Sequence, residues 1–483
     1  MSAIHVLPGL KRPFAVNAPL RALVTCITEA GGRPVAVGGS VRDHLLGKPC
    51  KDIDIEVYRL ALAALEQAVA GFEVHAVGRA FGVLKVGVTV GDSKETFDVA
   101  LPRSESKIGA GHKGFVVDSD PHMEPKAAAA RRDFTINAIG VDLAATTSLA
   151  LVDPWHGVSD LQRGVLRHVS PAFDEDPLRV LRAAQFAARL SFDVAPETIE
   201  RCSALLAELH TLPVERVWAE LCKLLVKGVW PSVGLQVLER TGALAALFPE
   251  LHALKGCQQE PEWHPEGDVW LHTLMVVDEA ARLARDEQLD DDERLLVMLG
   301  ALCHDLGKPA TTERIEGRIR SRDHESQGEP PTRALLARLG APHQLIDDVT
   351  ALVREHLKPF MLFKELATRP TGAADSAVRR LALRVPIPRL VRVARADHFG
   401  RTTTEALERA DPAGTWLLAE ARRLDVDSKQ PKPLLLGRHL IAQGSKPGPA
   451  MGTVLKEAFE AQLEGAFDDE TGALAWLSRR TAP

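Results

Sequence analysis

The chain has few cysteines and none spaced to hold a metal or a disulfide framework. Six cysteines are scattered over 483 residues, with no Cys-x-x-Cys pair. This argues against a zinc ribbon and against a disulfide-stapled secreted fold, and it suits a reducing cytoplasm. No uncharged apolar stretch reaches the roughly 18 residues that a membrane span needs, and no basic segment followed by an apolar one opens the chain, as in a secretory signal. We expect a cytoplasmic protein without a membrane partner.

An excess of positive charge is also missing. The 59 lysines and arginines are outnumbered by 65 acidic residues, for a net charge of −6. A nucleic-acid partner would therefore have to contact local basic surface. The sequence contains no internal repeat and no low-complexity tract, and its 45% hydrophobic and 26% charged residues are ordinary for a globular protein. The length predicts roughly two to four domains.

The most informative stretch is a glycine pair that ends an apolar run and is followed by two carboxylates. It reads VGGSVRD from Val37 to Asp43 and KDID from Lys51 to Asp54. Glycines let backbone amides approach a triphosphate, and successive amides form an anion-binding concavity. On a strand, Asp52 and Asp54 would share one face, where carboxylates and phosphate oxygens suit Mg²⁺. Alone, each motif is usually a turn or solvated surface; together they indicate transfer of a nucleoside monophosphate from a triphosphate.

This stretch resembles the head of the DNA polymerase beta superfamily of nucleotidyltransferases, specifically the bacterial class II tRNA nucleotidyltransferases, or CCA-adding enzymes, and their poly(A) polymerase relatives. The resemblance covers nearly the whole chain. It implies an α+β fold with a polymerase-beta-like head of mixed sheet and helices, an all-α neck, an HD-type helical body and a helical tail. The implied domains are a nucleotidyltransferase head at 1–150, a neck with a base-recognition motif at 151–250, an HD phosphohydrolase domain at 251–400 and a tRNA-binding tail at 401–483.

Apolar periodicity predicts the elements of the head. Helices are expected at 21–31 and 41–46, and strands at 35–37, 53–57, 84–88 and 96–100. The polar stretch 102–121, with Gly109, Gly111 and Gly114, predicts a mobile loop. From about residue 174 helical patterns dominate, with prolines at the helix boundaries.

The resemblance assigns metal ligands in the head. It implies that Asp52 and Asp54 bind two Mg²⁺ ions. These ions would activate the RNA 3′-hydroxyl and neutralise the departing pyrophosphate. Asp98 is the candidate for a third carboxylate, and a surface acid at a strand end is the alternative.

It also assigns contacts to the triphosphate. Gly38, Gly39 and Arg42 would form the cradle for the phosphates. A second signature, RRDFTINA from Arg131 to Ala138, implies that Arg132 reaches the triphosphate, because a guanidinium fork matches phosphate oxygens. Surface arginines are the alternative.

A third signature, EDPLRVLR from Glu175 to Arg182, carries the expected choice of base. Asp176, Arg179 and Arg182 stand three apart and would form a row on a helix, all binding the nucleotide. The resemblance implies that Asp176 and Arg179 read the base: a carboxylate accepts from the amino group of C or A, and an arginine donates to the adjacent ring acceptor. A surface ion-pair row is the alternative. Many relatives carry arginine where this chain has Gln185, which leaves the last contact of the row open.

A second constellation lies in the later half of the chain. Its members are His272, His304, Asp305 and Asp397. They resemble the HD phosphohydrolase superfamily, in which such a set binds a divalent metal. Imidazoles select transition metals, so Ni²⁺, Mn²⁺ or Co²⁺ is expected here, and such an ion can activate water for attack on a phosphate ester. His324 and His356 fall where relatives place further histidines, and for each a structural histidine is the alternative.

RNA contacts are expected towards the C-terminus. The segment from Leu436 to Pro449 precedes a predicted helix and resembles the tRNA-holding segment of these enzymes, where helix-start amides can cradle a phosphate; a plain connecting turn is the alternative. Upstream, six arginines would either line the RNA path or solvate helices. They are Arg379, Arg380, Arg384, Arg389, Arg392 and Arg395.

These features together predict an enzyme that adds CCA to the 3′ end of tRNA from CTP and ATP, without a nucleic-acid template, and releases pyrophosphate. The HD domain would add metal-dependent 2′,3′-cyclic phosphodiesterase, 2′-nucleotidase or phosphatase activity. A poly(A) polymerase, or an enzyme adding only CC or only A, is the alternative within the same class, although the 102–121 loop favours full CCA addition. From another class, the chain could be an HD phosphohydrolase whose head only binds RNA.

Overall fold

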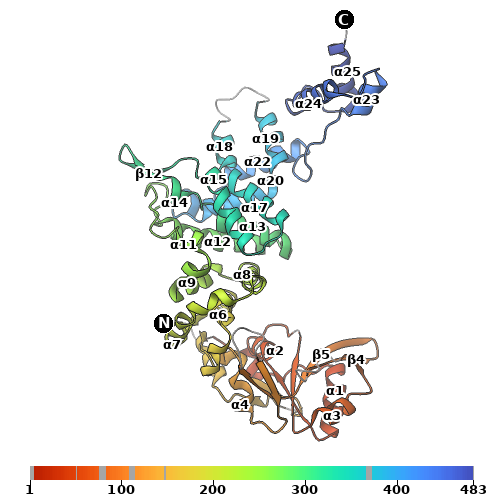
Figure 1. Ribbon diagram of the computed structural model, residues 1–483, viewed down its shortest axis with the longest axis vertical. Coiled ribbons are helices and arrows are strands. Elements are labelled where there is room, and N and C mark those ends of the chain that lie inside the picture. Colours follow the sequence, from red (N-terminus) through yellow and green to blue (C-terminus); the bar gives the residue numbers. More distant parts are fainter. Residues whose placement is uncertain are drawn as a thin grey trace. The chain divides into compact units, whose positions relative to one another are not determined.

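The computed structural model describes residues 5–50, 52–75, 83–107, 115–145, 148–365 and 373–481. The chain divides into two compact units (Figure 1). Unit 1 comprises Met1–Leu224 and Val233–Leu247, and unit 2 comprises Leu225–Ser232 and Phe248–Pro483. The finer division into four domains stays a prediction. In the described part of the chain no helix is both long and apolar enough to span a membrane.

A seven-stranded mixed sheet forms the centre of unit 1, with the strand order β3-β4-β5-β2-β1-β8-β9. β2 and β5 run parallel, and the other neighbours run antiparallel. All four predicted strands are confirmed within it. The strands are β1 (Arg33–Val37), β2 (Asp54–Tyr58), β3 (Glu73–His75), β4 (Val83–Val90), β5 (Ser93–Ala100), β8 (Gly140–Asp142) and β9 (Leu151–Val152).

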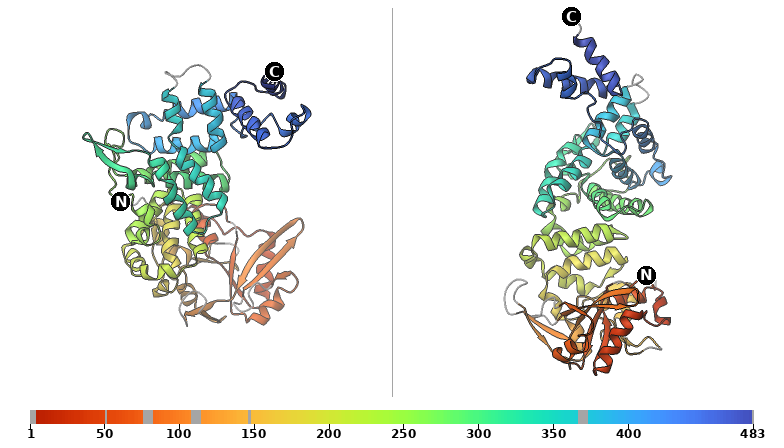
Figure 2. Two further views of the ribbon diagram at one scale, coloured as in Figure 1. Left: turned by 45° about the horizontal axis from the view of Figure 1, so that its top comes forward. Right: turned by 90° about the vertical axis from the view of Figure 1, so that its right-hand side faces the viewer.

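Helices cover this sheet. The predicted helix at 21–31 is confirmed as α1 (Ala18–Glu29), which starts earlier because the Asn17 side chain accepts a hydrogen bond from the Leu20 amide and caps it. Its apolar side packs on β4 and β5, and Figure 2 shows this helical layer beside the strands. The other predicted helix is confirmed as α2 (Gly39–Leu45), directly after β1. Further elements of this part are η1 (Pro8–Lys11), α3 (Leu62–Ala68), α4 (Pro125–Ala130), η3 (Thr135–Asn137) and α5 (Gly157–Arg163).

The loop predicted at 102–121 is wrong at 103–107 and 115–119, where the structure has strands. β6 (Arg103–Lys107) and β7 (Phe115–Ser119) pair as an antiparallel ribbon. The three glycines fall in residues 108–114, outside the described residues. A two-stranded ribbon is held by its backbone ladder, and polar strand sequences without clear alternation give little sign of it.

The prediction that helices dominate after residue 174 is confirmed. Unit 1 continues with β10 (Val165–Leu166), η4 (Pro171–Glu175), α6 (Leu178–Leu190), β11 (Asp193–Val194), α7 (Pro196–Ala204), η5 (Leu206–Thr211) and α10 (Ala243–Leu247). Most of α8 (Val214–Lys227) and of α9 (Pro231–Thr241) also belongs to unit 1, and the end of α8 and the start of α9 belong to unit 2. The helices of unit 2 are α11 (Pro249–His252), α12 (Val269–Asp286), α13 (Asp291–Cys303), α14 (Lys308–Thr311), α15 (His324–Gln327), α16 (Glu329–Arg338), α17 (His343–Glu355), α18 (Lys358–Glu365), α19 (Ala373–Arg384), α20 (Ile387–Phe399), α21 (Thr404–Leu407), α22 (Pro412–Arg423), α23 (Gly437–Ala442), α24 (Pro449–Leu463) and α25 (Glu470–Thr481).

Unit 2 also contains a β-hairpin that the sequence interpretation missed. β12 (Thr312–Ile315) and β13 (Arg318–Ser321) pair antiparallel. The two residues between them, Glu316 and Gly317, have φ values of 50° and 81°. Positive φ at both central residues is the mark of a tight hairpin turn, and the Glu-Gly pair between short alternating runs was the available signal.

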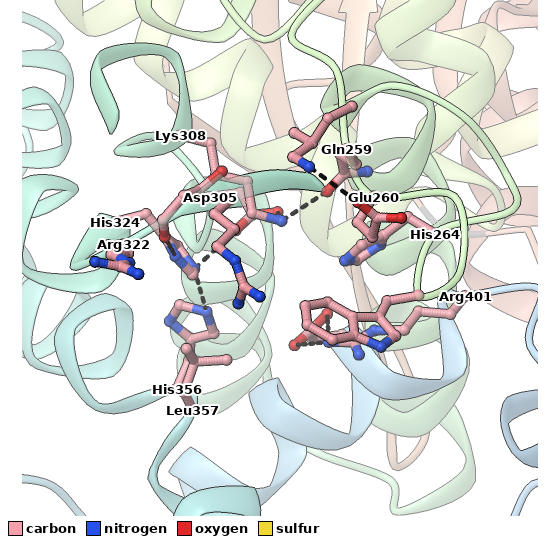
Figure 3. Close-up of a pocket in the computed structure, with 15 residues that line it drawn as sticks. Gln259, Glu260, His264, Asp305, Lys308, Arg322, His324, His356, Leu357 and Arg401 are labelled. Carbon is pink, nitrogen blue, oxygen red and sulfur yellow. Dashed lines mark hydrogen bonds and ion pairs between the residues drawn. The ribbon is translucent and has the colours of Figure 1, made fainter. Parts of the chain in front are cut away.

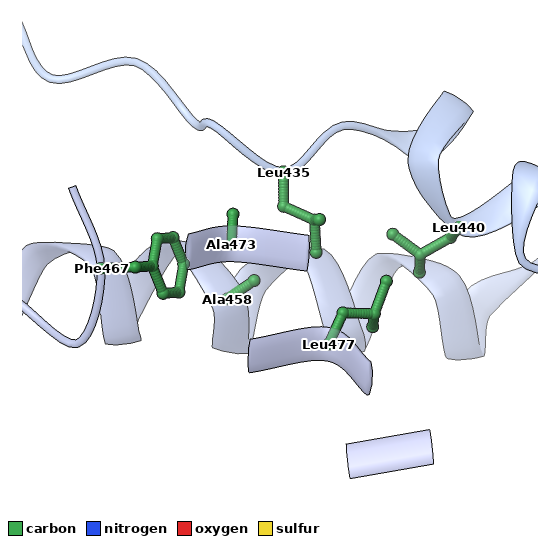
Figure 4. Packing of buried hydrophobic residues seen from close by; sticks show 6 residues of the cluster. All are labelled: Leu435, Leu440, Ala458, Phe467, Ala473 and Leu477. Carbon is green, nitrogen blue, oxygen red and sulfur yellow. The ribbon is translucent and has the colours of Figure 1, made fainter. Parts of the chain in front are cut away.

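The last three helices pack around a small core of their own. Figure 4 shows its buried residues, which come from the segment before α23 and from α23 to α25. They are Leu435, Leu440, Ala458, Phe467, Ala473 and Leu477. The C-terminal helices are thus held by contacts among themselves as well as by contacts between α24 and α19.

Candidate active sites

A pocket at the start of β2 collects three carboxylates. Asp54 begins β2 and is the direct register partner of Asp98 on the parallel strand β5, so both side chains lie on the same face of the sheet. Asp52 lines the same pocket. Its predicted place on the strand is wrong, because the strand begins only at Asp54 and Asp52 has a left-handed backbone with φ 53°. A turn, and not strand alternation, brings Asp52 to the other two.

Electrostatics in this pocket favour a cation. Burial raises the pKa of Asp54; Arg132 opposes this, and the neighbouring Asp98 and Asp52 raise the pKa further. Lys85 lies 3.9 Å from Asp98 across the strands. Neighbouring carboxylates that repel one another are stabilised by a shared divalent ion. Within the described residues their oxygens do not all come within 4.8 Å of one another, so water or phosphate oxygens would have to complete the shell.

The glycine pair lies against the same pocket. Gly38 has φ 80°, and a Cβ there would come 3.2 Å from Arg132 Nη1 and 3.6 Å from Asp54 Oδ2. The structure thus brings together three residues from separate motifs.

Glu56 holds Arg132 in place at this pocket. Arg132 donates to Glu56 Oε1 at 2.9 Å. Burial of Glu56 is outweighed by Arg132 and Arg131, which hold the pKa of this carboxylate below its usual range. Glu56 was missed in the sequence, although its place two residues after Asp54 on β2 was the signal.

Arg42 lies behind the glycines and belongs to a buried network. It is 2% exposed, and its Nη1 donates to Asn137 Oδ1 at 2.6 Å. Asn137 donates to Asp133 Oδ1 at 3.0 Å, and Asp133 Oδ2 accepts from Arg182 at 2.8 and 2.5 Å. Both guanidiniums lie 5.2 Å from the ring centroid of Phe186. The network joins α2, which follows the glycines, to α6; Asp133 and Asn137 had been assigned no role.

Asp176 lies outside the helix that was predicted to carry it. It has φ −125° and ψ 101°, and α6 begins two residues later. The residue before a proline is disfavoured in the helical region, and Pro177 follows, so the predicted helical row is wrong at its first member. Asp176 Oδ2 instead accepts from Arg216 on α8 at 3.1 Å.

Arg179 and Arg182 lie on α6 three residues apart, as predicted. Arg179 donates to the backbone carbonyls of Ala172 and Arg131, at 2.7 and 2.6 Å. It therefore ties the second signature to the third. Gln185 is buried on the same helix, at 4% exposure.

A cluster of histidines and carboxylates lies inside unit 2 (Figure 3). The helices of this unit bring together every residue of the second constellation. His272 is on α12, His304 and Asp305 follow α13, His324 begins α15, His356 follows α17 and Asp397 is on α20. All six are buried, at 8% exposure or less. We call these six residues the histidine cluster.

The ring nitrogens of the cluster are oriented for metal binding. The Nδ1 atoms of His304, His324 and His356 each lie 2.6 to 2.8 Å from the carbonyl three residues earlier. A carbonyl only accepts, so each Nδ1 carries a proton, and in the neutral ring the lone pair is then on Nε2. His272 Nδ1 lies 2.9 Å from Glu266 Oε1, which is the carboxylate backing common to metal-bound histidines. From the sequence, Glu266 was assigned no role, although the stretch His264-Pro265-Glu266-Gly267 stands where the second constellation begins.

The pKa values of His356 and Asp305 suit a metal, whereas burial of His304 is outweighed by Asp305 and Asp397, which raise its pKa, so a cation would have to displace a proton there. Burial, with His324 and His304 nearby, lowers the pKa of His356 to about 3. Burial of Asp305 is outweighed by His304 and Lys308, which hold its pKa well below the usual range. Neutral imidazoles and ionised carboxylates are the forms that bind metals. The buried atoms His304 Nε2 and Asp305 Oδ2 lie 3.1 Å apart, yet neither makes a well-formed hydrogen bond among the described residues, and a cation bound by both would satisfy them.

Among the described residues, three groups of side chains have ligand atoms close enough to share a cation. One consists of His264, Glu266 and His272, and the other two lie within the histidine cluster. His272 and His304 form one group with Asp305, and His324 and His356 form the other with Asp305; in each group the atoms lie within 4.8 Å of one another. Asp305 directs Oδ2 to His304 at 3.1 Å and Oδ1 to His324 at 3.3 Å. His272 Nε2 lies 3.0 Å from Asp397. Asp305 belongs to both groups of the cluster, so its two carboxylate oxygens are available to a cation in either one.

The six arginines of α19 and α20 are all engaged by the protein. Arg379 donates to the Leu463 carbonyl at 3.2 Å, and each of the other five pairs with acidic side chains. The pairs are Arg380 with Glu460 and Glu464, Arg384 with Glu355, Arg389 with Glu293, Arg392 with Glu287, and Arg395 with Asp411. The place of these arginines along an RNA path stays a prediction beside the alternative that they solvate the helices. In the tail, 436–449 contains the short helix α23 and leads into α24, and its phosphate contact stays a prediction.

Three families match consecutive parts of the chain. Residues 35–167 match the family described as Poly A polymerase head domain, and residues 191–255 match the family described as Probable RNA and SrmB-binding site of polymerase A. Residues 269–402 match the HD domain. The first match contains the carboxylate pocket, and the third contains the histidine cluster.

Proteins of known name match over most of the length. The chain is 41% identical over 438 residues to the multifunctional CCA protein of Xanthomonas campestris pv. campestris (strain B100), covering 89% of this chain and 98% of that protein. The CCA-adding enzyme of Bacillus stearothermophilus in complex with CTP has a TM-score of 0.63 at 23% identity, over 96% and 98% of the two chains. The Thermotoga maritima CCA-adding enzyme complexed with tRNA_CCA has a TM-score of 0.58 at 20% identity, over 96% and 94%. The two solved structures confirm the predicted α+β fold.

Proposed function

The chain belongs to the family of multifunctional CCA proteins, and on that premise we propose that it adds CCA to the 3′ end of tRNA from CTP and ATP without a nucleic-acid template. We propose further that unit 2 hydrolyses 2′,3′-cyclic phosphates and 2′-phosphates. The observation that carries the first proposal is the pocket in which Asp54 and Asp98 stand in register beside Gly38 and Arg132.

The transfer follows from the groups around this pocket. The 3′-oxygen of tRNA attacks the α-phosphorus, the bond from that phosphorus to the bridging oxygen breaks, and pyrophosphate leaves with the electron pair. Mg²⁺ held by Asp52 and Asp54, with Asp98 as third ligand, would favour loss of the hydroxyl proton to solvent and neutralise the leaving group. Arg132, only 18% exposed at its side chain, lies where it can contact the triphosphate beside Gly38. Gly39 leaves the backbone accessible, and Arg42 holds that turn from behind.

Base selection is assigned to the start of α6. Asp176 and Arg182 keep 28% and 33% of their side chains exposed, so both can reach a bound nucleotide. A carboxylate accepts from the exocyclic amino group that C and A share and that U lacks, while the arginines donate to ring acceptors. Arg179 contributes through the two carbonyls it holds in place, as well as through any contact to the base.

The histidine cluster supports hydrolysis. Bound cations such as Ni²⁺, Mn²⁺ or Co²⁺ would activate water and polarise a phosphate. Water adds to the phosphorus of a 2′,3′-cyclic phosphate, one of the two ring P–O bonds breaks, and the proton ends on the released ribose oxygen. The protein orients four imidazoles by their Nδ1 contacts and shares Asp305 between the two ligand groups.

One experiment separates the candidate transferases. Purified protein is incubated with tRNA lacking its 3′ end, with CTP alone, ATP alone and both, and the products are sequenced. We expect CC with CTP alone and CCA with both. A long A tail would instead identify a poly(A) polymerase, and no incorporation of either nucleotide would leave an HD phosphohydrolase with an RNA-binding head.

Replacing Gly38 with alanine is expected to reduce CCA addition about tenfold or more. A left-handed residue with a Cβ costs roughly 1–2 kcal/mol, and here the added atom also meets Arg132 at 3.2 Å. Gly91→Ala is the matched control, because Gly91 has φ 57° and no atom within 4 Å of the added Cβ. The measurement is kcat/KM for CTP together with thermal unfolding. Equal kcat/KM values for the two variants would contradict a role of Gly38 in binding the triphosphate.

A further inference from the structure

A pocket of about 310 Å³ opens beside the histidine cluster. Asp305, His324, His356 and Asp397 line one part of it, and the loop before α12 and strand β13 line another. In Figure 3, His324 and His356 lie on one side of the pocket and His264 and Arg401 on the other. The volume exceeds what a phosphate group alone would fill, so the pocket has room for the rest of a larger substrate.

The two outer walls of the pocket are tied together. Glu260 Oε2 accepts from the Ile319 amide of β13 at 2.9 Å, and Glu262 pairs with Arg318 at 3.0 Å. The Trp263 amide donates to the Glu260 carbonyl at 3.0 Å. The backbone that carries Trp263 is thus fixed against the hairpin.

Trp263 exposes an aromatic surface at this pocket. It lines the pocket and keeps 47% of its surface exposed. It immediately precedes His264, whose Nδ1 lies 2.9 Å from Glu266 Oε1, and the same oxygen lies 2.9 Å from His272. A large ring held on a braced segment beside the histidine cluster is suited to stack on a planar group.

Two further side chains of the lining carry unused positive charge. Arg320 and Arg322 line the pocket, and neither forms an ion pair or a side-chain hydrogen bond within the described residues. Lys308, by contrast, is held by Asp305 at 2.8 Å and by Gln259 at 2.6 Å. The histidine cluster already accounts for the phosphate that is hydrolysed, so the two arginines suit a second phosphate.

We propose that this pocket binds the terminal nucleotide of an RNA chain, with Trp263 stacked on its base and with Arg320 and Arg322 contacting the phosphate that precedes it. The inference rests on the proposed hydrolase function and adds its substrate class. A small phosphate ester would use the metal ligands alone, whereas an RNA end ending in a 2′,3′-cyclic phosphate uses all three elements. Trp263 and the two arginines are therefore specificity residues, not members of the catalytic set.

The test compares three substrates on the full chain with Ni²⁺. Glycerol 1,2-cyclic phosphate has no base, adenosine 2′,3′-cyclic monophosphate adds the base, and a dinucleotide ending in a 2′,3′-cyclic phosphate adds the preceding phosphate. For Trp263→Ala we expect KM to rise about fivefold to a hundredfold on both substrates with a base, the range that base stacking supports. Its kcat stays within about threefold and glycerol cyclic phosphate is unaffected. Trp263→Phe restores most of the affinity.

The arginines are tested on the same set. The double variant Arg320→Gln/Arg322→Gln raises KM for the dinucleotide more than for the mononucleotide, while Arg314→Gln, on the other strand of the hairpin and outside this pocket, changes neither. Equal losses on all three substrates, or no loss on any, would overturn the inference and leave the hydrolase function standing. A wild-type protein that hydrolyses none of the three would instead defeat the hydrolase function and the inference with it.

Discussion

Asp305→Asn is expected to lower hydrolysis of adenosine 2′,3′-cyclic monophosphate by on the order of a thousandfold and to leave CCA addition within about twofold. Asp305 belongs to both ligand groups of the histidine cluster. An amide of the same shape removes the charge that binds the cations, and one of its ends is a donor that cannot coordinate. The measurements are hydrolysis with saturating Ni²⁺, bound metal per chain, and CCA addition by the same preparation.

The control for this variant is Asp347→Asn. Asp347 lies on α17 in the same unit, and its carboxylate is 59% exposed in an ion pair with Arg333. Asp305 also neutralises the buried Lys308, and an unpaired buried charge costs roughly 3–5 kcal/mol, so thermal unfolding is followed for both variants. Unchanged hydrolysis in a folded Asp305→Asn protein would show that the histidine cluster does not catalyse this reaction.

Asp54→Ala should abolish nucleotide addition, with a loss of about a thousandfold or more, and spare hydrolysis. The neighbours of Asp54 explain the size of the effect: Asp98 is its register partner, Asp52 lines the same pocket, and Gly38 and Arg132 lie beside it. Its removal takes away the carboxylate between the other two and leaves phosphate neutralisation incomplete. Incorporation of radiolabelled CTP and of ATP into tRNA lacking its 3′ end measures the loss.

Asp92→Ala serves as the matched control, since Asp92 is exposed at the turn between β4 and β5, away from the carboxylate pocket of the same sheet. Asp98→Ala tests whether Asp98 acts as the third metal ligand. We expect it to lose less nucleotide addition than Asp54→Ala, because Asp98 is half exposed and lies near Lys85. A folded Asp54→Ala protein that lost both activities would contradict two independent sites.

The sequence predicted which side chains meet, and it was less reliable about how the backbone brings them together. Asp54 and Asp98 were placed on strands correctly because apolar alternation is strong there. Asp52 and Asp176 were placed wrongly because one adopts a left-handed turn and the other precedes a proline, and local backbone geometry overrides spacing at such points. The histidine ligands were found from residue type and adjacency, since buried polar groups of this kind are hard to explain by packing.

What escaped prediction depended on contacts that leave no periodic pattern in the sequence. The hairpin β12–β13 is short and polar, and its strands bury little. Glu266 backs His272 from the loop before α12, only a few residues earlier, whereas Arg42 on α2 reaches Asn137, 95 residues later in the chain, which in turn contacts Asp133. Apolar periodicity reports which face of an element is buried, and a single side-chain hydrogen bond has no such pattern.

The pairing of the arginines on α19 and α20 with acidic side chains bears on how tRNA affinity responds to ionic strength. Each phosphate that a protein neutralises with a free cation releases condensed counterions, and the slope of log K against log salt counts those phosphates. Arg384, Arg389 and Arg395 already have carboxylate partners, so RNA passing over them would release few ions. Binding over this surface would therefore depend little on salt, and shape would contribute more of the affinity than charge.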